Sequence, residues 1–297
     1  MNIGFIGVGR IGRLMAQHVL DAVYDLFVND LNRESAQPLL EKGARWVESP
    51  KLIAQLCPVV LTCLPGPPEV EAVVYGDNGL MAGWKEGDIY VDMSTNSPTT
   101  VRRVAADAKL KGVSVLDAPV SGGIQGAEAA TLSIIVGGDA QCLERVRQIL
   151  AVIGKNIFHV GDVGCGNIAK IVNNMISAGC NAITAECMVL GVKAGIDPQK
   201  LYEVIRTSSG NNYWIERYYS TLIFKGNFEP GFRINLALKD IGLARALGNE
   251  YGISLPVSDI VEQKYLEAKA AGLGEKGTAA IILPLEESAG VKVRSTA

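Results

Sequence analysis

The stretch "GFIGVGRIGRLMA", residues 4–16, places Gly7, Gly9 and Gly12 in a G-x-G-x-x-G spacing. It continues a strand-like run that begins at residue 2 and opens a helix-like segment. In this context the first glycine permits a tight turn, the second lets the backbone approach a pyrophosphate, and the third lets helix and strand pack closely. The helix N-terminus adds N–H groups that suit phosphates. The stretch therefore predicts a dinucleotide-binding site at the start of an α/β fold.

The next strand-like run, residues 25–30, ends in Asp30, roughly 20 residues after the last glycine of the motif. A carboxylate at this position accepts hydrogen bonds from the adenosine ribose hydroxyls and repels a 2′-phosphate. We therefore expect NAD as the cofactor, with NADP the less favoured choice. Two alternatives stay open. Asp30 can simply cap the following turn, and Arg33 can contact a phosphate.

The first half of the chain alternates strand-like and helix-like segments. Further strand-like runs occupy residues 59–64, 88–93 and 113–119, and helical patterns occupy 10–22, 33–42 and 98–111. This alternation predicts a parallel sheet covered by helices on both faces. The runs 131–138 and 156–161 bracket another helical pattern and extend the sheet. We expect residues 1–163 to form a Rossmann-type, doubly wound NAD(P)-binding domain.

After residue 163 strand patterns become scarce and helical patterns dominate. Residues 165–194 contain no proline, which predicts one long helix, and weaker helical patterns follow at 198–208, 236–250 and 256–271. We expect residues 164–297 to form an all-α substrate and oligomerisation domain, joined to the first by this long interdomain helix. The tail at 291–297 is expected to be frayed.

Length and composition restrict the class of protein. A chain of 297 residues exceeds what one hydrophobic core usually organises, so two domains are expected. The net charge of -3 offers no basic footprint for nucleic acid or an anionic membrane. The beginning of the chain lacks a secretory pattern, and no uninterrupted apolar run is long enough to span a bilayer, so a cytoplasmic location is expected. The six cysteines show no CxxC spacing and there are only two histidines, so we predict reduced thiols and no metal site.

Three short motifs stand where strands should end, the edge at which open α/β sheets bind ligands. They are "CLPGPPE" (63–69), "DMSTNSP" (92–98) and "DAPVSGG" (117–123). The middle motif offers the Ser94 and Thr95 hydroxyls near the expected nicotinamide end. The "SGG" of the last motif, residues 121–123, exposes backbone N–H groups beside a hydroxyl, which suits a carboxylate. Each motif alone is also compatible with an ordinary turn.

The stretch "GNIAKIVNNM", residues 166–175, places Lys170, Asn173 and Asn174 in a run that otherwise suits a buried helix. A buried lysine costs several kcal/mol unless it is paired or deprotonated, so its presence needs a reason. Lys170 and Asn174 lie four positions apart and share one helix face, whereas Asn173 points elsewhere. The alternative is that Lys170 extends to the surface.

Together these motifs resemble the β-hydroxyacid dehydrogenase family, which includes 3-hydroxyisobutyrate dehydrogenases, tartronate semialdehyde reductases and 2-(hydroxymethyl)glutarate dehydrogenases. The resemblance rests on the glycine stretch, "DAPVSGG", "GNIAKIVNN" (166–174) and "LALKDIGLA" (236–244), which together cover nearly the whole chain. It implies that Lys170 is the catalytic lysine and Asn174 its supporting amide. It further implies that Ser121, Gly122 and Gly123 hold a substrate carboxylate.

For the cofactor, the resemblance implies that Gly7, Gly9 and Gly12 bind the pyrophosphate. Toward the nicotinamide it implies Leu64, Pro65 and Thr95 along the path, and Lys239 closing over the cofactor from the helical domain. The chain departs from the family at Arg10 and Ile11, where relatives often carry a small residue and methionine. We include both among the cofactor-contacting residues, because their bulk would narrow the approach of the pyrophosphate.

These assignments imply hydride transfer between a nicotinamide and a short 3-hydroxy acid or its semialdehyde. Oxidising a hydroxyl requires a base within about 3 Å of its oxygen, and the same group donates the proton in reduction. The segment "SSGNNYWIERYY" (208–219) either forms the substrate pocket wall or only packs helices, so the substrate and the physiological direction stay open.

Two other functions remain as alternatives. A non-catalytic dinucleotide sensor would need neither Lys170 nor the serine-glycine cradle, and an imine reductase on the same scaffold would be expected to carry an acid or a tyrosine in place of that lysine. The apolar run 165–195 and the resemblance imply a homo-oligomer, a dimer or a tetramer, although those faces can also complete a monomer core.

Overall fold

The computed structural model describes residues 1–295 and divides into two compact units, the first ending at Lys170 and the second beginning at Ile171. Each unit has its own hydrophobic core. The division falls at Lys170 rather than at residue 163, because the first turns of the long helix belong to the sheet-containing unit.

The first unit is built on one mixed sheet with the strand order β3-β2-β1-β4-β5-β6-β8-β7, and β9 pairs with β8. The strands are β1 (Asn2–Ile6), β2 (Asp25–Asn29), β3 (Arg45–Trp46), β4 (Val59–Thr62), β5 (Ile89–Asp92), β6 (Ser114–Asp117), β7 (Val120–Ser121), β8 (Ser133–Gly137) and β9 (Asn156–Gly161). The strands from β1 to β6 are mutually parallel, whereas β8 runs antiparallel to β6. The predicted doubly wound sheet is confirmed, with β8 and β9 reversed in direction.

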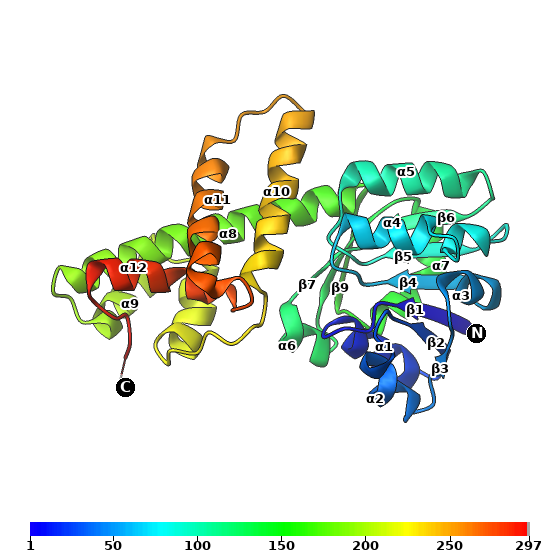
Figure 1. The fold of residues 1–297 in the computed structure, drawn as a ribbon, viewed down its shortest axis with the longest axis horizontal. Coiled ribbons are helices and arrows are strands. Elements are labelled where there is room, and N and C mark those ends of the chain that lie inside the picture. The colour runs from blue at the N-terminus through cyan, green and yellow to red at the C-terminus, as the bar shows by residue number, and fades with distance from the viewer. Residues whose placement is uncertain (296–297) are drawn as a thin grey trace. The chain divides into compact units, whose positions relative to one another are not determined.

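Helices cover both faces of this sheet (Figure 1). One core cluster includes residues of α1 (Gly12–Asp21), α2 (Gln37–Leu40), α6 (Gly123–Glu128) and α7 (Ala140–Ala151); the other includes residues of α3 (Pro50–Leu56), α4 (Pro67–Tyr75) and α5 (Pro98–Lys109). Alternate residues of a strand serve the two clusters, since Leu61 packs in the first and Val60 in the second. Because successive side chains point to opposite faces of the sheet, the strands are buried on both sides.

The second unit is helical, as predicted. Its helices are α8 (Cys165–Lys193), which starts in the first unit, α9 (Pro198–Arg206), α10 (Ile234–Glu250), α11 (Pro256–Ala268) and α12 (Ile282–Ala289), with π-helical turns at Ile215–Ile223 and Lys269–Leu273. The long helix was predicted to within a residue. The core of the second unit is rich in aromatic side chains, and Tyr219 and Tyr265 are almost fully buried.

The expectation of a frayed C-terminal tail is wrong for the residues next to α12. Val293 is fully buried and its N–H donates to Glu286 Oε1 over 2.8 Å, while Arg294 forms an ion pair with the same carboxylate at 2.6 Å. The buried Val293 side chain and the buried Glu286 carboxylate, which needs a partner, therefore hold this segment. Residues 296–297 lie outside the described part of the chain.

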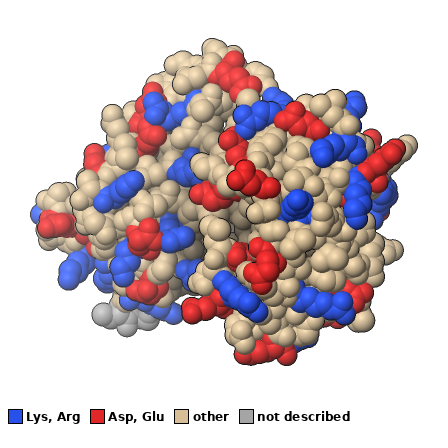
Figure 2. Space-filling view, turned by 45° about the vertical axis from the view of Figure 1, so that its right-hand side comes forward, with Lys and Arg blue, Asp and Glu red and all other residues tan. Residues whose placement is uncertain are grey.

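Helix α8 is, among the described residues, the one helix long and apolar enough to cross a membrane, a test that the core helix of a soluble protein also passes. Lys170, Asn174 and Asn181 interrupt its apolar sequence. On the molecular face drawn in Figure 2, basic and acidic side chains are interspersed.

Candidate active site

The glycine loop after β1 has the stereochemistry that its sequence predicts. Gly7 has φ +88°, a conformation that favours glycine, and a side chain at Gly12 would collide with the carbonyl oxygen of Gly7. At Gly9, by contrast, a Cβ would meet no atom within 4 Å. The loop thus presents exposed backbone with open space in front of it at the beginning of α1. This arrangement fits the pyrophosphate of a dinucleotide, which a Cβ at Gly9 would displace.

Asp30 joins this loop to the end of β2. Its Oδ2 accepts a hydrogen bond from the Val8 N–H over 2.8 Å, and its Oδ1 accepts one from the Asn32 N–H over 2.9 Å. The turn-capping interpretation of Asp30 is therefore correct, but each oxygen keeps a second lone pair for a ribose hydroxyl. Arg33 is occupied elsewhere, because its guanidinium lies 5.4 Å from the centre of the Trp46 ring and 3.8 Å from Glu48.

The loops that follow β4 and β5 are fixed to one another. The Leu64 N–H donates to Ser94 Oγ over 2.9 Å, and the Ser94 N–H donates to Asp92 Oδ1 over 3.0 Å. This bond places Leu64 beside the loop that carries Thr95, which is half-buried, whereas Pro65 is exposed. Leu64 and Thr95 therefore lie on adjoining loops at the carboxyl edge of parallel strands, where such sheets bind ligands.

The serine-glycine segment forms the turn from β7 into α6. Ser121 pairs with Ser133 of β8, Gly122 has φ +135°, and α6 begins at Gly123. A residue with a side chain at Gly122 would be strained. Both glycines are exposed, so the backbone here is accessible to a ligand.

Lys170 lies near the start of α8 and is only 8% exposed, so it does not extend to the surface. Asp117, at the end of β6, holds the beginning of this helix. Its carboxylate accepts hydrogen bonds from the N–H groups of Gly164, over 2.7 Å, and Asn167, over 2.6 Å. Burial, opposed in part by these bonds, raises the pKa of Asp117 to about 6. The helix that carries Lys170 is thus bound directly to the sheet.

In the second unit, Asn174 is held by an acid that the sequence analysis did not select. Its Nδ2 donates to Asp240 Oδ2 over 2.6 Å, and Asp240 Oδ1 lies 3.0 Å from Lys239 Nζ. Asp240 is 3% exposed. The side chain of Asn173 is exposed and donates to Asn174 Oδ1 over 3.1 Å. The position of Asp240 next to Lys239 in "LALKDIGLA" was the signal that could have identified it.

A pocket of about 70 Å³ opens beside Asn174 within the second unit. It is lined by Asn174, Ser177, Ala178, Trp214, Phe232, Ala237, Asp240, Tyr265 and Thr278. The Trp214 indole donates to the Ser177 carbonyl over 2.9 Å, which fixes the ring in the wall.

Of the residues considered between 208 and 219, Trp214 alone lines this pocket. Asn212 instead accepts from the Trp214 N–H over 3.0 Å, Asn211 donates to Glu216 over 2.7 Å, and Arg217 lies 5.8 Å from the centre of the Tyr213 ring. Asn211, Asn212, Tyr213 and Arg217 thus organise the local chain.

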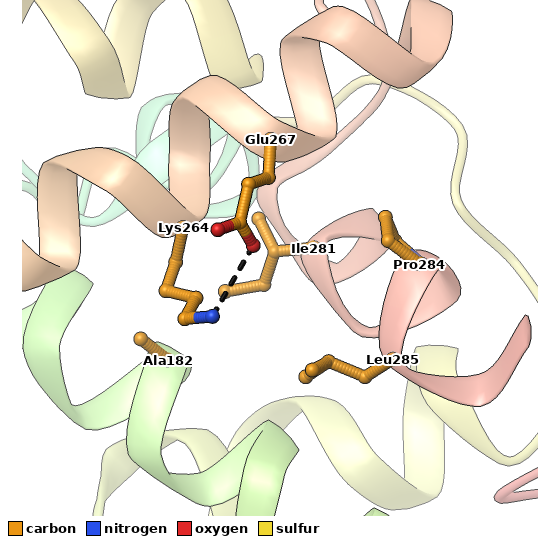
Figure 3. Close-up of a pocket in the computed structure, with 6 residues that line it drawn as sticks. All are labelled: Ala182, Lys264, Glu267, Ile281, Pro284 and Leu285. Carbon is orange, nitrogen blue, oxygen red and sulfur yellow. Dashed lines mark hydrogen bonds and ion pairs between the residues drawn. The ribbon is translucent and has the colours of Figure 1, made fainter. Parts of the chain in front are cut away.

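A second depression lies between α8, α11 and α12 (Figure 3). In it the Lys264 ammonium donates to Glu267 over 3.2 Å, and Ala182, Ile281, Pro284 and Leu285 supply the apolar part. Its volume of about 10 Å³ suffices for at most one water molecule. It is too small for an organic substrate.

Comparison with known proteins decides the family. Residues 2–161 match the family model for the NAD-binding domain of 6-phosphogluconate dehydrogenase, and residues 164–285 match that for the NAD-binding region of NADP-dependent 3-hydroxyisobutyrate dehydrogenase. The chain is 40% identical to 2-(hydroxymethyl)glutarate dehydrogenase of Eubacterium barkeri, over 99% of this chain and 97% of that protein. The chain belongs to the β-hydroxyacid dehydrogenase family.

Two further members of this family extend the comparison. A 3-hydroxyisobutyrate dehydrogenase of Pseudomonas aeruginosa is 40% identical over 91% of this chain and 93% of its own length. The solved structure of 3-hydroxyisobutyrate dehydrogenase from Mycobacterium tuberculosis with L-serine has a TM-score of 0.88 at 33% identity, covering 96% of this chain and 98% of that one. Imine reductases also match, but at 17% identity the likeness to one from Pseudomonas shows the fold alone. As a β-hydroxyacid dehydrogenase, the chain is an NAD(P)-dependent oxidoreductase that acts on CH–OH groups.

Proposed function

We propose that this β-hydroxyacid dehydrogenase interconverts a short 3-hydroxy acid and its semialdehyde, with Lys170 as the general acid and base. The observation that carries the proposal is the burial of Lys170 to 8% exposure on α8, one turn before Asn174. A lysine withdrawn from water can exchange a proton near neutral pH, whereas a solvated one is held in its charged form.

In the oxidative direction, the neutral Lys170 amine accepts the proton of the substrate hydroxyl as the C–H hydride leaves the same carbon. A nicotinamide cofactor, when bound, takes up that hydride. In reduction, the Lys170 ammonium returns a proton to the carbonyl oxygen. Asn174 orients the substrate oxygen or the amine, and its own amide is held in place by Asp240. These two roles account for the presence of Lys170 and Asn174 on one helix face.

We also propose NAD as the preferred cofactor. The open space at Gly9 and the N-terminus of α1 suit the pyrophosphate, with Gly7, Arg10, Ile11 and Gly12 around it. The free lone pairs of Asp30 suit ribose hydroxyls and disfavour a 2′-phosphate. Toward the nicotinamide we assign Leu64, Pro65, Thr95 and Lys239. Arg33, the cation considered for a 2′-phosphate, instead lies over the Trp46 ring.

For the substrate we assign the carboxylate to Ser121, Gly122 and Gly123. Exposed backbone at two successive glycines can donate N–H groups to a carboxylate without steric hindrance. Within the second unit, Trp214 and Phe232 line the pocket of about 70 Å³ beside Asn174. These features support a small carboxylate as the substrate class.

We further propose that the protein is a cytoplasmic homo-oligomer, a dimer or a tetramer. Val172, Ile176, Ile183 and Leu190 of α8 are between 49% and 69% exposed. At about 100° per residue these four positions fall within roughly 40° of one another, so they form one apolar stripe. Burial of such a stripe against a second copy would remove apolar surface from water. A native mass equal to 31.6 kDa in light scattering would contradict the proposal.

The first test is a kinetic comparison of the wild type with Lys170→Ala, followed by the absorbance of the reduced nicotinamide. A panel of 3-hydroxy acids and semialdehydes is offered with NAD(H) and NADP(H), and cofactor affinity is measured separately by calorimetry. Lys193→Ala, which removes a lysine from the last turn of the same helix, is the matched control. We expect Lys170→Ala alone to lose about 10²- to 10⁴-fold in kcat while it retains cofactor affinity.

Two results would overturn the proposal. Cofactor binding without turnover of any compound in the panel would favour the sensor function. Turnover that is equal in the wild type and Lys170→Ala would remove the lysine from the chemistry.

A further inference from the structure

Four polar side chains are completely buried where β5, β6 and α8 meet. Asp92, Asn96, Asp117 and Asn167 are each at most 1% exposed, and we refer to them as the buried polar network. The two acids are register neighbours on adjacent parallel strands. Such burial is costly unless each polar group has a partner. All four residues belong to the unit that ends at Lys170.

Asn167 is the member that connects the helix to the sheet on two sides. Its Oδ1 accepts the backbone N–H of Asn96 over 2.7 Å, and its Nδ2 donates to Asp117 Oδ2 at 3.3 Å. The Asn96 side chain in turn donates to Asp92 Oδ2 over 2.9 Å. An amide is required at Asn167 for this pattern, because one end accepts while the other donates.

The network reaches two parts of the proposed active site. On one side Asp92 accepts from the Ser94 N–H, and the Ser94 hydroxyl holds Leu64, which fixes the loops assigned to the cofactor. On the other side Asn167 precedes Lys170 by three residues, so both lie on the same face of α8. A change in how Asn167 is seated would therefore be transmitted to Lys170 within one helical turn.

We propose that Asn167 is a positioning residue, which fixes the height and rotation of α8 on the sheet and thereby holds Lys170 at the distance that proton transfer requires. The inference rests on the proposed role of Lys170. Asn167 touches neither substrate nor cofactor in this account, and acts only through the lysine. Proton transfer demands placement to a fraction of an ångström, and a 1 Å error can cost about 10²-fold in rate.

In the Asn167→Asp variant, we expect the position of α8 on the sheet to depend on pH. The new carboxylate would keep the bond from the Asn96 N–H but would place an oxygen opposite Asp117 Oδ2, where the amide now donates at 3.3 Å. Two carboxylates at this separation cannot both ionise without strong repulsion, so at low pH they share one proton and preserve the contact. As the pH rises the proton is lost and the helix is pushed from the sheet.

Several other charged or titratable groups lie on the elements packed here. They are Asp92 on β5, Arg102 on α5, His159 on β9, Asp162 in the following loop, and Cys165 and Lys170 on α8. Asp92 acts directly on Asp117, whose pKa it raises further. In the Asn167→Asp variant its charge therefore adds to the tendency of Asp117 and the introduced carboxylate to retain a shared proton.

The experiment compares kcat at saturating substrate and NAD for the wild type, Asn167→Asp and Asn29→Asp, from about pH 6 to 9. Asn29 is a buried amide in the same unit that donates to the Val47 carbonyl over 2.7 Å, so the control introduces the same charge at a comparable depth. We expect the ratio of Asn167→Asp to wild-type kcat to fall at least about tenfold across this range. For Asn29→Asp we expect that ratio to stay constant, while its melting temperature falls with rising pH.

A constant ratio for Asn167→Asp, or equal profiles for the two variants, would overturn the inference. If Asn167→Asp does not fold, Asn167→Ala decides the question, with an expected loss of about 10- to 100-fold in kcat and an NAD dissociation constant within about twofold of the wild type. An unchanged kcat in that variant, or parallel losses in kcat and NAD affinity, would refute it. Lys170→Ala measured alongside separates the two ideas, because a dispensable Lys170 would refute the proposed function itself.

Discussion

A single methyl group at Gly166 tests how closely α8 must approach the sheet. In the Gly166→Ala variant, the new Cβ would lie 2.5 Å from the carbonyl oxygen of Ile135, 2.7 Å from that of Asp117 and 2.9 Å from Asp117 Oδ2. Ordinary contacts begin near 3.4 Å, so the start of the helix must move away by roughly 0.5–1 Å. Overpacking of this kind typically costs about 1–3 kcal/mol, or roughly 2–10 °C in melting temperature.

The same displacement would carry Lys170 with it, because Gly166 precedes that lysine by about one turn. We therefore expect kcat to fall about 10- to 100-fold. Gly179→Ala on the same helix controls for helix propensity, since its Cβ would meet only Val261 Cγ2, at 3.8 Å. That variant should be as stable as the wild type or more stable, by up to about 1 kcal/mol. Calorimetry and steady-state kinetics suffice, and a Gly166→Ala protein with wild-type stability and kcat would refute this account of how α8 is seated.

Two further predictions concern the cofactor loop and pH. Gly9→Ala should fold with wild-type stability, because its Cβ meets no atom within 4 Å, but should weaken NAD binding at least about tenfold in calorimetric titration; undiminished affinity would place the pyrophosphate elsewhere. Burial raises the pKa of Asp117 from 3.8 to about 6, so its contribution to stability is complete below about pH 4 and is lost as the pH rises through 6. The full shift corresponds to about 3 kcal/mol, of which about 1.4 kcal/mol remains at pH 5. Urea unfolding from pH 5 to 7.5 should therefore reveal a decline of about 1.4 kcal/mol that Asp117→Asn lacks, and equal slopes would contradict the assignment.

Local patterns were sufficient to predict much of the architecture. The spacing of Gly7, Gly9 and Gly12 after a strand, and the proline-free run from Cys165, each act over a few turns of chain and therefore appear directly in the sequence. Strands of two residues, such as β3 and β7, are too short to show a period and were not anticipated. Helices α3 and α4 were not anticipated either.

The parts of the candidate site that escaped prediction depend on contacts between distant segments. Asp117 and Asn167 both stand in quoted motifs, yet the bond between them spans 50 residues and no local pattern announces it. Asp240 and Asn174 are separated by 66 residues, and their pairing likewise emerges only when α8 and α10 are folded together. Chemistry-bearing residue types can thus be selected from sequence, whereas the groups that orient them require the tertiary fold.

The attachment of α8 to Asp117 also constrains where this protein can be divided by recombination. A chimera joined at residue 163 would receive the turn that carries the Gly164 and Asn167 N–H groups from a foreign parent, and a helix seated differently on the sheet would leave the buried Asp117 carboxylate without these donors. A junction placed after Lys170 would transfer the anchoring turns together with the sheet that they serve. The helical unit can thus be exchanged between relatives with least damage when the junction lies inside α8. A domain boundary would ordinarily be placed in the loop that precedes this helix.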